Sequence, residues 1–187
     1  MNPEQLPDGL PVPSDDGAAD HLPGSAVPAL ALPTTDGREV DLAALGQPRA
    51  VLYVYPMTAR PGVPSPDGWD QIPGARGCTP ESCGFRDHHA ELAAAGAQVC
   101  GLSSQDTDYQ AEAVTRLRLP FPLISDSDML LARQLALPTF TVGDLRLYKR
   151  ITLVLRDHRV EHVFYPVFPP DRHAQHVLDW LHANPTS

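Results

Sequence analysis

The stretch Gly77–Asp87, with the sequence GCTPESCGFRD, places Cys78 and Cys83 five positions apart at the predicted start of a helix. Pro80 is tolerated in the first turn of a helix, and Glu81 suits the positive end of the helix dipole. A thiol is a useful nucleophile only as the thiolate, and unpaired amides at a helix N-terminus help to lower its pKa. The motif therefore indicates redox chemistry, while a metal site, a disulfide and a pair of inert cysteines remain open.

The five-residue spacing limits what the two thiols can do while a helix holds them. Five steps of about 100° place the side chains about 140° apart around the axis, and the Cα atoms are then separated by roughly 8–9 Å. A disulfide needs Cα atoms closer than about 7 Å. Cys78 and Cys83 therefore cannot be bridged until the first turns of the helix unwind.

Length and charge restrict the classes of function. The 187 residues, 42% of them hydrophobic, can bury one sizeable core, so we expect one domain with a tail. The net charge of −9 gives no electrostatic reason to bind nucleic acid or an anionic membrane surface. An uncharged small substrate suits this charge better.

The N-terminal residues lack the features of a secretory signal, because the first basic residue is Arg38 and no apolar run of sufficient length precedes it. No segment approaches the roughly 18 apolar residues of a membrane span. We therefore expect a cytoplasmic protein. In that compartment closely spaced cysteines are more often catalytic, redox-sensing or metal-binding than structural.

The chain before the cysteines divides into three parts. Residues 1–24 are acidic and proline-rich without a basic residue, which predicts a disordered or loosely attached tail before a domain over residues 25–187. The turn signal Thr34–Gly37 predicts a short hairpin, and the apolar run Ala50–Tyr55 predicts a central strand buried on both faces. Residues 57–77 are rich in proline and glycine, which predicts a long loop.

The remainder alternates between helical and extended patterns. This alternation predicts a three-layer α/β/α fold around a mixed sheet. The expected helices cover Thr79–Ala95, Asp108–Leu117, Leu130–Leu137 and Asp171–His182, and the expected strands cover Gln98–Ser104, Phe121–Ser125, Ile151–Asp157 and Arg159–Tyr165.

The cysteine motif resembles the active-site stretch of the Q-type peroxiredoxins, also called bacterioferritin comigratory proteins, which carry Gly-Cys-Thr, four residues between the cysteines and a following Phe-Arg-Asp. Other blocks resemble that family in the same order over roughly residues 26–182. They are VLYVYP (51–56), VCGLSSQD (99–106), PFPLISDSD (120–128) and YKRITLVLRDHRVEHVF (148–164). The resemblance implies a thioredoxin-like peroxiredoxin fold.

The same resemblance implies a set of roles. Cys78 would attack hydrogen peroxide or an organic hydroperoxide and become a sulfenic acid, and Cys83 would resolve it as an intrachain disulfide that a thioredoxin-like dithiol reduces. Arg150 would hold the thiolate and stabilise the developing charge, while Pro56 would shield the thiolate from solvent. No metal or organic cofactor is required, and the subgroup suggests a monomer.

One departure from the family pattern concerns a hydroxyl donor. The family usually has a threonine three residues before the first cysteine, where this chain has Ala75. Between Pro56 and Cys78 this chain also has some 15 residues more than the family pattern. We hypothesise that Thr58 supplies the hydroxyl while the inserted loop forms a lid or a partner surface.

Several alternatives remain beside the peroxidase. A redox sensor or regulatory binding protein with little turnover is one, and a disulfide reductase is another, although reductases usually carry two residues between their cysteines. A zinc site is also conceivable, with the candidate ligands Cys78, Cys83, His88 and His89. Cys100 lies in an apolar strand pattern and is interpreted as a small core residue.

Overall fold

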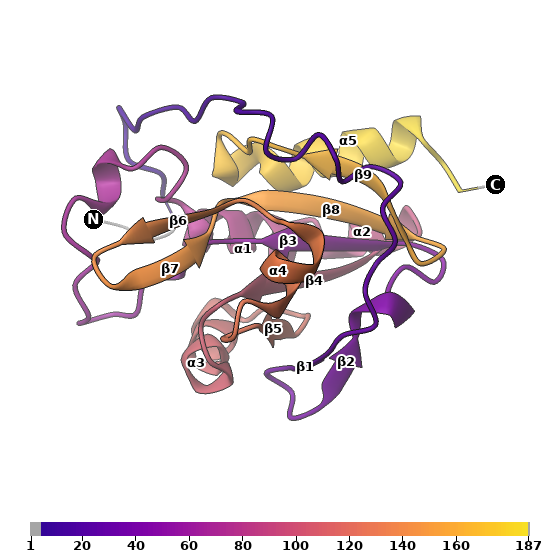
Figure 1. Cartoon of the computed structure of the whole chain (residues 1–187), viewed down its shortest axis with the longest axis horizontal. Helices are drawn as coiled ribbons and strands as arrows, with labels where there is room; N and C mark the ends of the chain where they lie inside the picture. The colour runs from indigo at the N-terminus through magenta and orange to yellow at the C-terminus, as the bar shows by residue number, and fades with distance from the viewer. Residues whose placement is uncertain (1–4, 187) are drawn as a thin grey trace.

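A five-stranded mixed sheet forms the centre of the structure, a computed structural model that describes residues 5–186 (Figure 1). In spatial order its strands are β5 (Leu123–Ser125), β4 (Gln98–Ser103), β3 (Ala50–Val54), β8 (Ile151–Arg156) and β9 (Arg159–Phe164). β3 pairs in parallel with β4 and antiparallel with β8. The predicted central strand is confirmed, and it leads directly into the loop before the cysteines.

Every residue of β3 is buried, because both faces of the sheet are covered. Leu52 and Val54 pack into the hydrophobic cluster on one face, while Val51 and Tyr53 pack into the cluster on the other. A strand covered on both sides has no polar face, which explains the continuous apolar run in the sequence.

Helices lie on both faces of the sheet, which confirms the three-layer α/β arrangement. α1 (Cys78–Asp87), α2 (His89–Ala94) and α5 (His173–Ala183) cover the face that carries Tyr53, and α4 (Leu130–Leu135) covers the opposite face. α3 (Thr107–Leu117) lies against β5 at the edge of the sheet (Figure 1). Short 3-10 helices are present at η1 (Leu42–Ala44), η2 (Trp69–Gln71) and η3 (Pro170–Arg172).

The expected helix over 79–95 is divided in two. His88 ends α1 with φ −95° and ψ 7° and begins α2. Leu92 of α2 and Phe85 of α1 are both fully buried, so the break lets each segment face the same core. Gly96 follows the second segment, as predicted, with a positive φ of 81°.

Two hairpins accompany the main sheet. The predicted hairpin near the N-terminus is present as β1 (Ala31–Pro33) paired with β2 (Glu39–Asp41). A second hairpin, β6 (Thr139–Val142) paired with β7 (Leu145–Tyr148), was not predicted. It positions the residues that follow β7, including Arg150.

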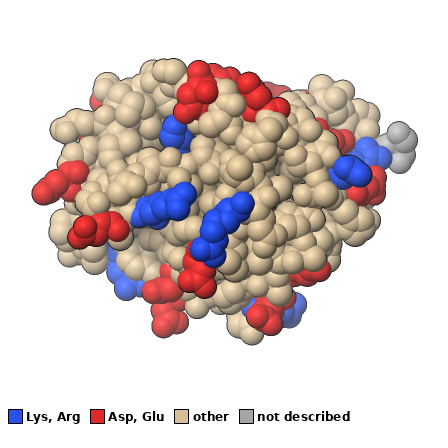
Figure 2. All heavy atoms as spheres, in the orientation of Figure 1, with Lys and Arg blue, Asp and Glu red and all other residues tan. Residues whose placement is uncertain are grey.

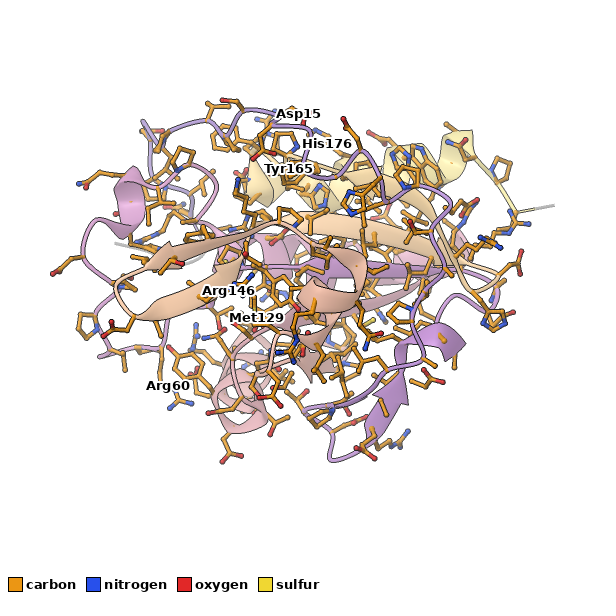
Figure 3. All side chains as sticks on the ribbon, in the orientation of Figure 1. Asp15, Arg60, Met129, Arg146, Tyr165 and His176 are labelled. Carbon is orange, nitrogen blue, oxygen red and sulfur yellow. The ribbon has the colours of Figure 1, made fainter. Side chains whose placement is uncertain are left out.

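Residues 5–24 differ from the expected loose tail, and residues 1–4 lie outside the described residues. Leu22 is fully buried in the core cluster that also contains Leu131 and Leu135 of α4, and Asp16 accepts hydrogen bonds from Lys149 at 2.7 Å and Tyr165 at 2.8 Å. Figure 3 shows Tyr165 beneath this segment, near Asp15. An apolar anchor and paired carboxylate fix a segment whose composition alone suggests disorder.

The loop over residues 57–77 is held by its own small core. Trp69 is buried and packs with Ala75, Val142 and Leu147, so part of the loop rests on the β6–β7 hairpin. At the other end, Arg60 lies over the Tyr109 ring of α3, 4.3 Å from its centroid (Figure 3). The loop is therefore tied to two elements of the domain.

The surface shows no continuous basic face in the orientation of Figure 2. Lysine and arginine side chains are scattered there, and acidic side chains gather along the edge where the N-terminal segment runs. Within residues 5–186, no helix combines the length and apolar character that a membrane crossing requires.

Candidate active site

Cys78 occupies the first position of α1, directly after Gly77. Gly77 has a φ of 111°, a region that favours glycine, and a Cβ atom there would lie 2.4 Å from Cγ of Pro170. The glycine therefore lets the chain turn tightly into the helix beneath Pro170. The Cys78 side chain is 3% exposed, at the helix end where unpaired amides favour an anion.

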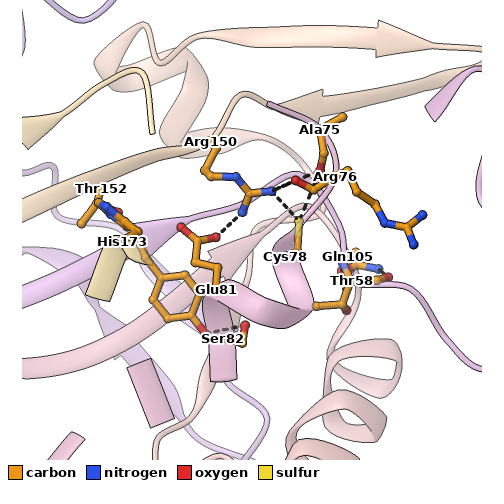
Figure 4. Close-up of polar contacts among 11 residues, drawn as sticks. Thr58, Ala75, Arg76, Cys78, Glu81, Ser82, Gln105, Arg150, Thr152 and His173 are labelled. Carbon is orange, nitrogen blue, oxygen red and sulfur yellow. Dashed lines mark hydrogen bonds and ion pairs between the residues drawn. The ribbon is translucent and has the colours of Figure 1, made fainter. Parts of the chain in front are cut away.

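Arg150, between β7 and β8, brings its guanidinium to the Cys78 sulfur (Figure 4). Its Nη2 donates to Sγ of Cys78 over 3.2 Å and to the backbone oxygen of Ala75 over 3.1 Å. Its Nη1 donates to a carboxylate oxygen of Glu81 in a short ion pair. Because fixed acceptors orient this buried cation, it presents one stable geometry to the sulfur.

Glu81 is a polar residue of the site that the sequence analysis did not assign. It follows Cys78 by three residues on α1, so both side chains reach the same guanidinium. Glu81 is fully buried, and its Oε1 has no hydrogen-bond partner among the described residues. Burial raises the pKa of Glu81 to about 7, although Arg150 opposes the rise. The three-residue spacing was the signal that could have identified it.

Opposing influences act on the Cys78 thiol. Burial is the largest and raises its pKa, while the guanidinium of Arg150 lowers it. The charge of Glu81 raises the pKa further, and a backbone N–H donated by Met57 lowers it. One cation thus serves two acidic groups, so the thiolate is favoured most when Glu81 is protonated.

Cys83 lies on the same continuous helix and is also buried. No disulfide joins it to Cys78. Because α1 runs unbroken through both positions, the helix geometry keeps their Cα atoms beyond bridging distance. A bond between the two sulfurs therefore requires α1 to unwind at its first turns.

Unwinding would also disrupt buried polar contacts between the two cysteines. Glu81 would leave Arg150, and Ser82 would lose its 3.1 Å hydrogen bond to the hydroxyl of Tyr53. Phe85 stacks on the Tyr53 ring with a centroid distance of 4.5 Å and anchors the next turn. Polar contacts of Glu81 and Ser82 therefore hold the first turn of α1, whereas the aromatic contact of Phe85 holds the turn that follows.

The structure does not bring Thr58 to Cys78 as a hydroxyl donor. The Thr58 hydroxyl donates to Oε1 of Gln105 over 3.2 Å, and the Thr58 N–H donates to the same oxygen over 2.9 Å. Ala75 contributes its backbone carbonyl to Arg150, and its side chain belongs to the same small hydrophobic cluster as Trp69. A backbone N–H, not a side-chain hydroxyl, accompanies Arg150 at the sulfur.

Pro56 is buried two residues after the end of β3, one residue before the Met57 amide that faces the sulfur. This position agrees with a role beside the thiolate, but the shielding of Cys78 by the Pro56 ring stays a prediction. The motif residues Arg86 and Asp87 pair with each other at 2.8 Å, and Arg86 also donates to the Leu117 carbonyl of α3. Their observed contacts are structural.

The zinc alternative lacks its ligand cluster in the described part of the chain. Between residues 5 and 186, no three His, Cys, Asp or Glu side chains are grouped so that they could hold a metal ion. His88 instead pairs with Glu91 at 2.9 Å, and His89 lies against the Phe121 ring. Cys100 is buried in β4, where burial raises its pKa to about 12.

The site combines a buried nucleophile, a fixed cation and a second thiol on a helix that must open. A cation beside the sulfur can stabilise both the thiolate and the negative charge that develops on a leaving oxygen. The second thiol can condense with an oxidised first sulfur. This combination suits the reduction of a small oxidant by two thiols.

Comparisons with known proteins agree with this chemistry. The redoxin family matches residues 22–178. Peroxiredoxin Q, chloroplastic, from Oryza sativa subsp. japonica is 31% identical over 159 residues, which make up 84% of this chain and 65% of the rice protein. The chain thus spans less than two thirds of that relative. Peroxiredoxin Bcp from Escherichia coli strain K12 is 30% identical over 162 residues, covering 84% of this chain and 94% of the relative.

Solved structures show the same fold. Peroxidoxin BcpB from Mycobacterium tuberculosis superposes with a TM-score of 0.71 at 29% identity, covering 89% of this chain and 100% of the other. Peroxiredoxin Q from Xanthomonas campestris gives a TM-score of 0.65 at 23% identity, covering 94% and 98%, and supports the fold alone.

Proposed function

The chain belongs to the redoxin family, and within it to the peroxiredoxins of the Q and Bcp type, and from this premise we propose that it is a thiol-dependent peroxidase. The observation that carries the proposal is the 3.2 Å contact between Arg150 Nη2 and the Cys78 sulfur at the start of α1. A hydroperoxide is the substrate class, and a thioredoxin-like dithiol is the reductant.

In the first step the Cys78 thiolate attacks the terminal oxygen of the hydroperoxide. The O–O bond breaks, an S–O bond forms, and the leaving oxygen takes a proton to depart as water or an alcohol. Arg150 donates toward the charge that develops on these oxygens, in a pocket where a hydrogen bond to a charged group is stronger than in water. The sulfur is left as a sulfenic acid.

In the second step the thiol of Cys83 attacks the sulfenic sulfur. A disulfide forms, the hydroxyl group leaves as water, and α1 unwinds to let the sulfurs meet. The external dithiol then exchanges with this disulfide and restores both thiols. The proposed resolving step depends on the geometry of one helix and needs no second subunit.

The decisive experiment follows peroxide consumption with a thioredoxin and thioredoxin reductase system. We expect catalytic turnover that Cys78→Ser abolishes and that Cys100→Ala preserves. Cys83→Ser should react with one equivalent of peroxide and then stop in this system. One oxidation without recycling of the unaltered chain would favour a redox sensor, and disulfide reduction without a peroxide reaction would favour a reductase.

Assembly and compartment are further proposals. We infer a monomer, because the proposed cycle closes within one chain. The cytoplasmic location stays a prediction, and the rice relative is described as chloroplastic.

A further inference from the structure

A small pocket leads to Cys78, and two segments outside the central sheet build its walls. Gln5 and Pro7 line it from the N-terminal segment, and Met57 and Trp69 line it from the loop over residues 57–77. We call this the Cys78 pocket. Its volume is about 40 Å³.

This volume is small for an organic substrate. A single water needs roughly 10–15 Å³ of such space, whereas a cavity of about 150 Å³ holds benzene. The Cys78 pocket therefore has room for the two oxygens of hydrogen peroxide and not for an aromatic ring. Because Cys78 is 3% exposed, a hydroperoxide cannot react without entering this space.

The N-terminal wall is held in place at several points. A Cβ atom at Gly77 would lie 2.9 Å from Cδ1 of Leu6, which shows how closely the segment approaches the start of α1. Pro13 lies near Gly74, where an added Cβ atom would be 3.5 Å from its Cγ. Asp16 then ties the segment to Lys149 and Tyr165.

The loop wall is held by its aromatic anchor. Trp69 is 5% exposed, and its ring lies 6.1 Å from that of Phe140 on β6. Arg76 of the same loop pairs with Asp70 at 2.9 Å, which closes the loop on itself next to the helix start. Both walls are therefore packed parts of the domain, and neither is a loosely hanging chain.

We propose that the N-terminal segment and Trp69 together act as a size filter, so that this peroxidase selects hydrogen peroxide over bulky tertiary hydroperoxides. The proposal rests on the proposed peroxidase function and specifies its substrate class. Trp69 is a specificity-determining residue in the pocket, and Asp16 is a positioning residue that holds the other wall.

The test compares kcat/KM for hydrogen peroxide and cumene hydroperoxide, with dithiothreitol as the reductant of the full-length chain. A single methylene too many in a hydrophobic pocket already costs about 10–200-fold, so we expect a preference of roughly 100-fold for hydrogen peroxide over the much larger cumene hydroperoxide. Trp69→Ala should reduce this ratio at least tenfold by raising the value for cumene hydroperoxide. Asp16→Asn should reduce it in the same direction.

Two matched variants separate pocket opening from general loosening. Ile72→Ala removes a partly buried side chain of the same loop core that does not line the Cys78 pocket, and it should keep the ratio. Asp15→Asn neutralises the neighbouring acid, whose side chain accepts a local hydrogen bond from the Gly17 amide, and it should also keep the ratio.

A ratio near one in the unaltered chain, with both peroxides consumed, overturns the filter while leaving the peroxidase intact. Absence of turnover with either peroxide instead overturns the proposed function. If circular dichroism shows that Trp69→Ala is unfolded, Asp16→Asn decides the question, because Asp16 is a surface residue. An unchanged ratio in Asp16→Asn would then refute the proposal.

Discussion

Replacing Glu81 with glutamine should make Cys78 more acidic above neutral pH. Glutamine keeps an oxygen that accepts a hydrogen bond from Arg150 and removes the charge that competes with the thiolate for the guanidinium. A charge within about 4–6 Å of a buried titratable group shifts the pKa of that group by about 1–3 units. A shift of about 1 unit in the pKa of Cys78 would raise its thiolate population about tenfold.

The pH dependence provides the distinctive signature. The pKa of Glu81 is raised to about 7, so at pH 6 the carboxyl is mostly protonated and the substitution changes the local charge little. At pH 8 the carboxylate is mostly ionised, and the substitution removes a full charge. We therefore expect the two proteins to behave alike at pH 6 and to diverge as the pH rises through 7.

The assay is the second-order rate constant of Cys78 with hydrogen peroxide, which fits the Cys78 pocket, measured by stopped flow between pH 6 and 8.5 in a background carrying Cys83→Ser and Cys100→Ala. The ratio of the Glu81→Gln rate to the Glu81 rate should climb from about 1 to about 10. Glu161→Gln is the matched control, because Glu161 also pairs with a buried arginine, Arg49, away from the cysteines. A ratio that stays constant with pH, or that falls below 1, refutes the reasoning.

The same substitution should change the pH dependence of stability. Glu81 has a folded-state pKa of about 7 and a reference value of 4.5, so the folded state binds more protons than the unfolded state between these pH values. Its favourable contribution is complete below pH 4.5 and is lost as the pH rises through 7. A shift of this size corresponds to about 3 kcal/mol in the free energy of unfolding. Urea denaturation at pH 5 and 8 should therefore show that Glu81→Gln loses less stability on going to pH 8.

Three further predictions concern neighbouring positions. Arg150→Lys should lower kcat/KM for hydrogen peroxide by roughly 10²–10³-fold, because a single ammonium group cannot reproduce the hydrogen bonds of a guanidinium to its several acceptors. Steady-state kinetics of a variant shown to be folded would check this. A loss of kcat/KM below threefold would contradict it. Thr58→Val should leave the rate constant of Cys78 with peroxide within threefold of the unaltered value. It should lower the free energy of unfolding by about 1 kcal/mol, because the hydrogen bond to Gln105 is lost. A large loss of rate in stopped-flow measurements would instead support Thr58 as the hydroxyl donor. Gly77→Ala should lower stability by about 2 kcal/mol or more in urea denaturation. Gly62 also has a positive φ but has no atom within 4 Å of an added Cβ, so Gly62→Ala should cost less.

The central strand and the order of the helices could be predicted because local patterns carry them. The run at β3 is apolar throughout, and a strand covered on both faces requires that pattern. The β6–β7 hairpin also had a local signal, since Val142 and Leu145 flank the two-residue turn Gly143-Asp144. It was missed although the signal was present.

The N-terminal segment is a different case. Its composition predicts disorder, and its attachment depends on partners far along the chain, Lys149 and Tyr165, which no local pattern reveals. The same limit applies to the site. The pairing of Arg150 with Cys78 was available from resemblance, whereas the burial of Glu81 against the same guanidinium depends on how α1 sits on the sheet.

In the proposed cycle, the placement of both cysteines on one intact helix also contributes to the reduction potential of the Cys78–Cys83 pair. Packing that stabilises α1 stabilises the dithiol form and leaves the disulfide form unaffected where the helix has opened. For a two-electron couple, each 1.4 kcal/mol of such stabilisation raises the potential by about 30 mV and makes the disulfide easier to reduce. The contacts of Ser82 with Tyr53 and of Glu81 with Arg150 therefore bias the protein toward its reduced state. The stability of α1 therefore contributes directly to the reduction potential of the proposed Cys78–Cys83 couple.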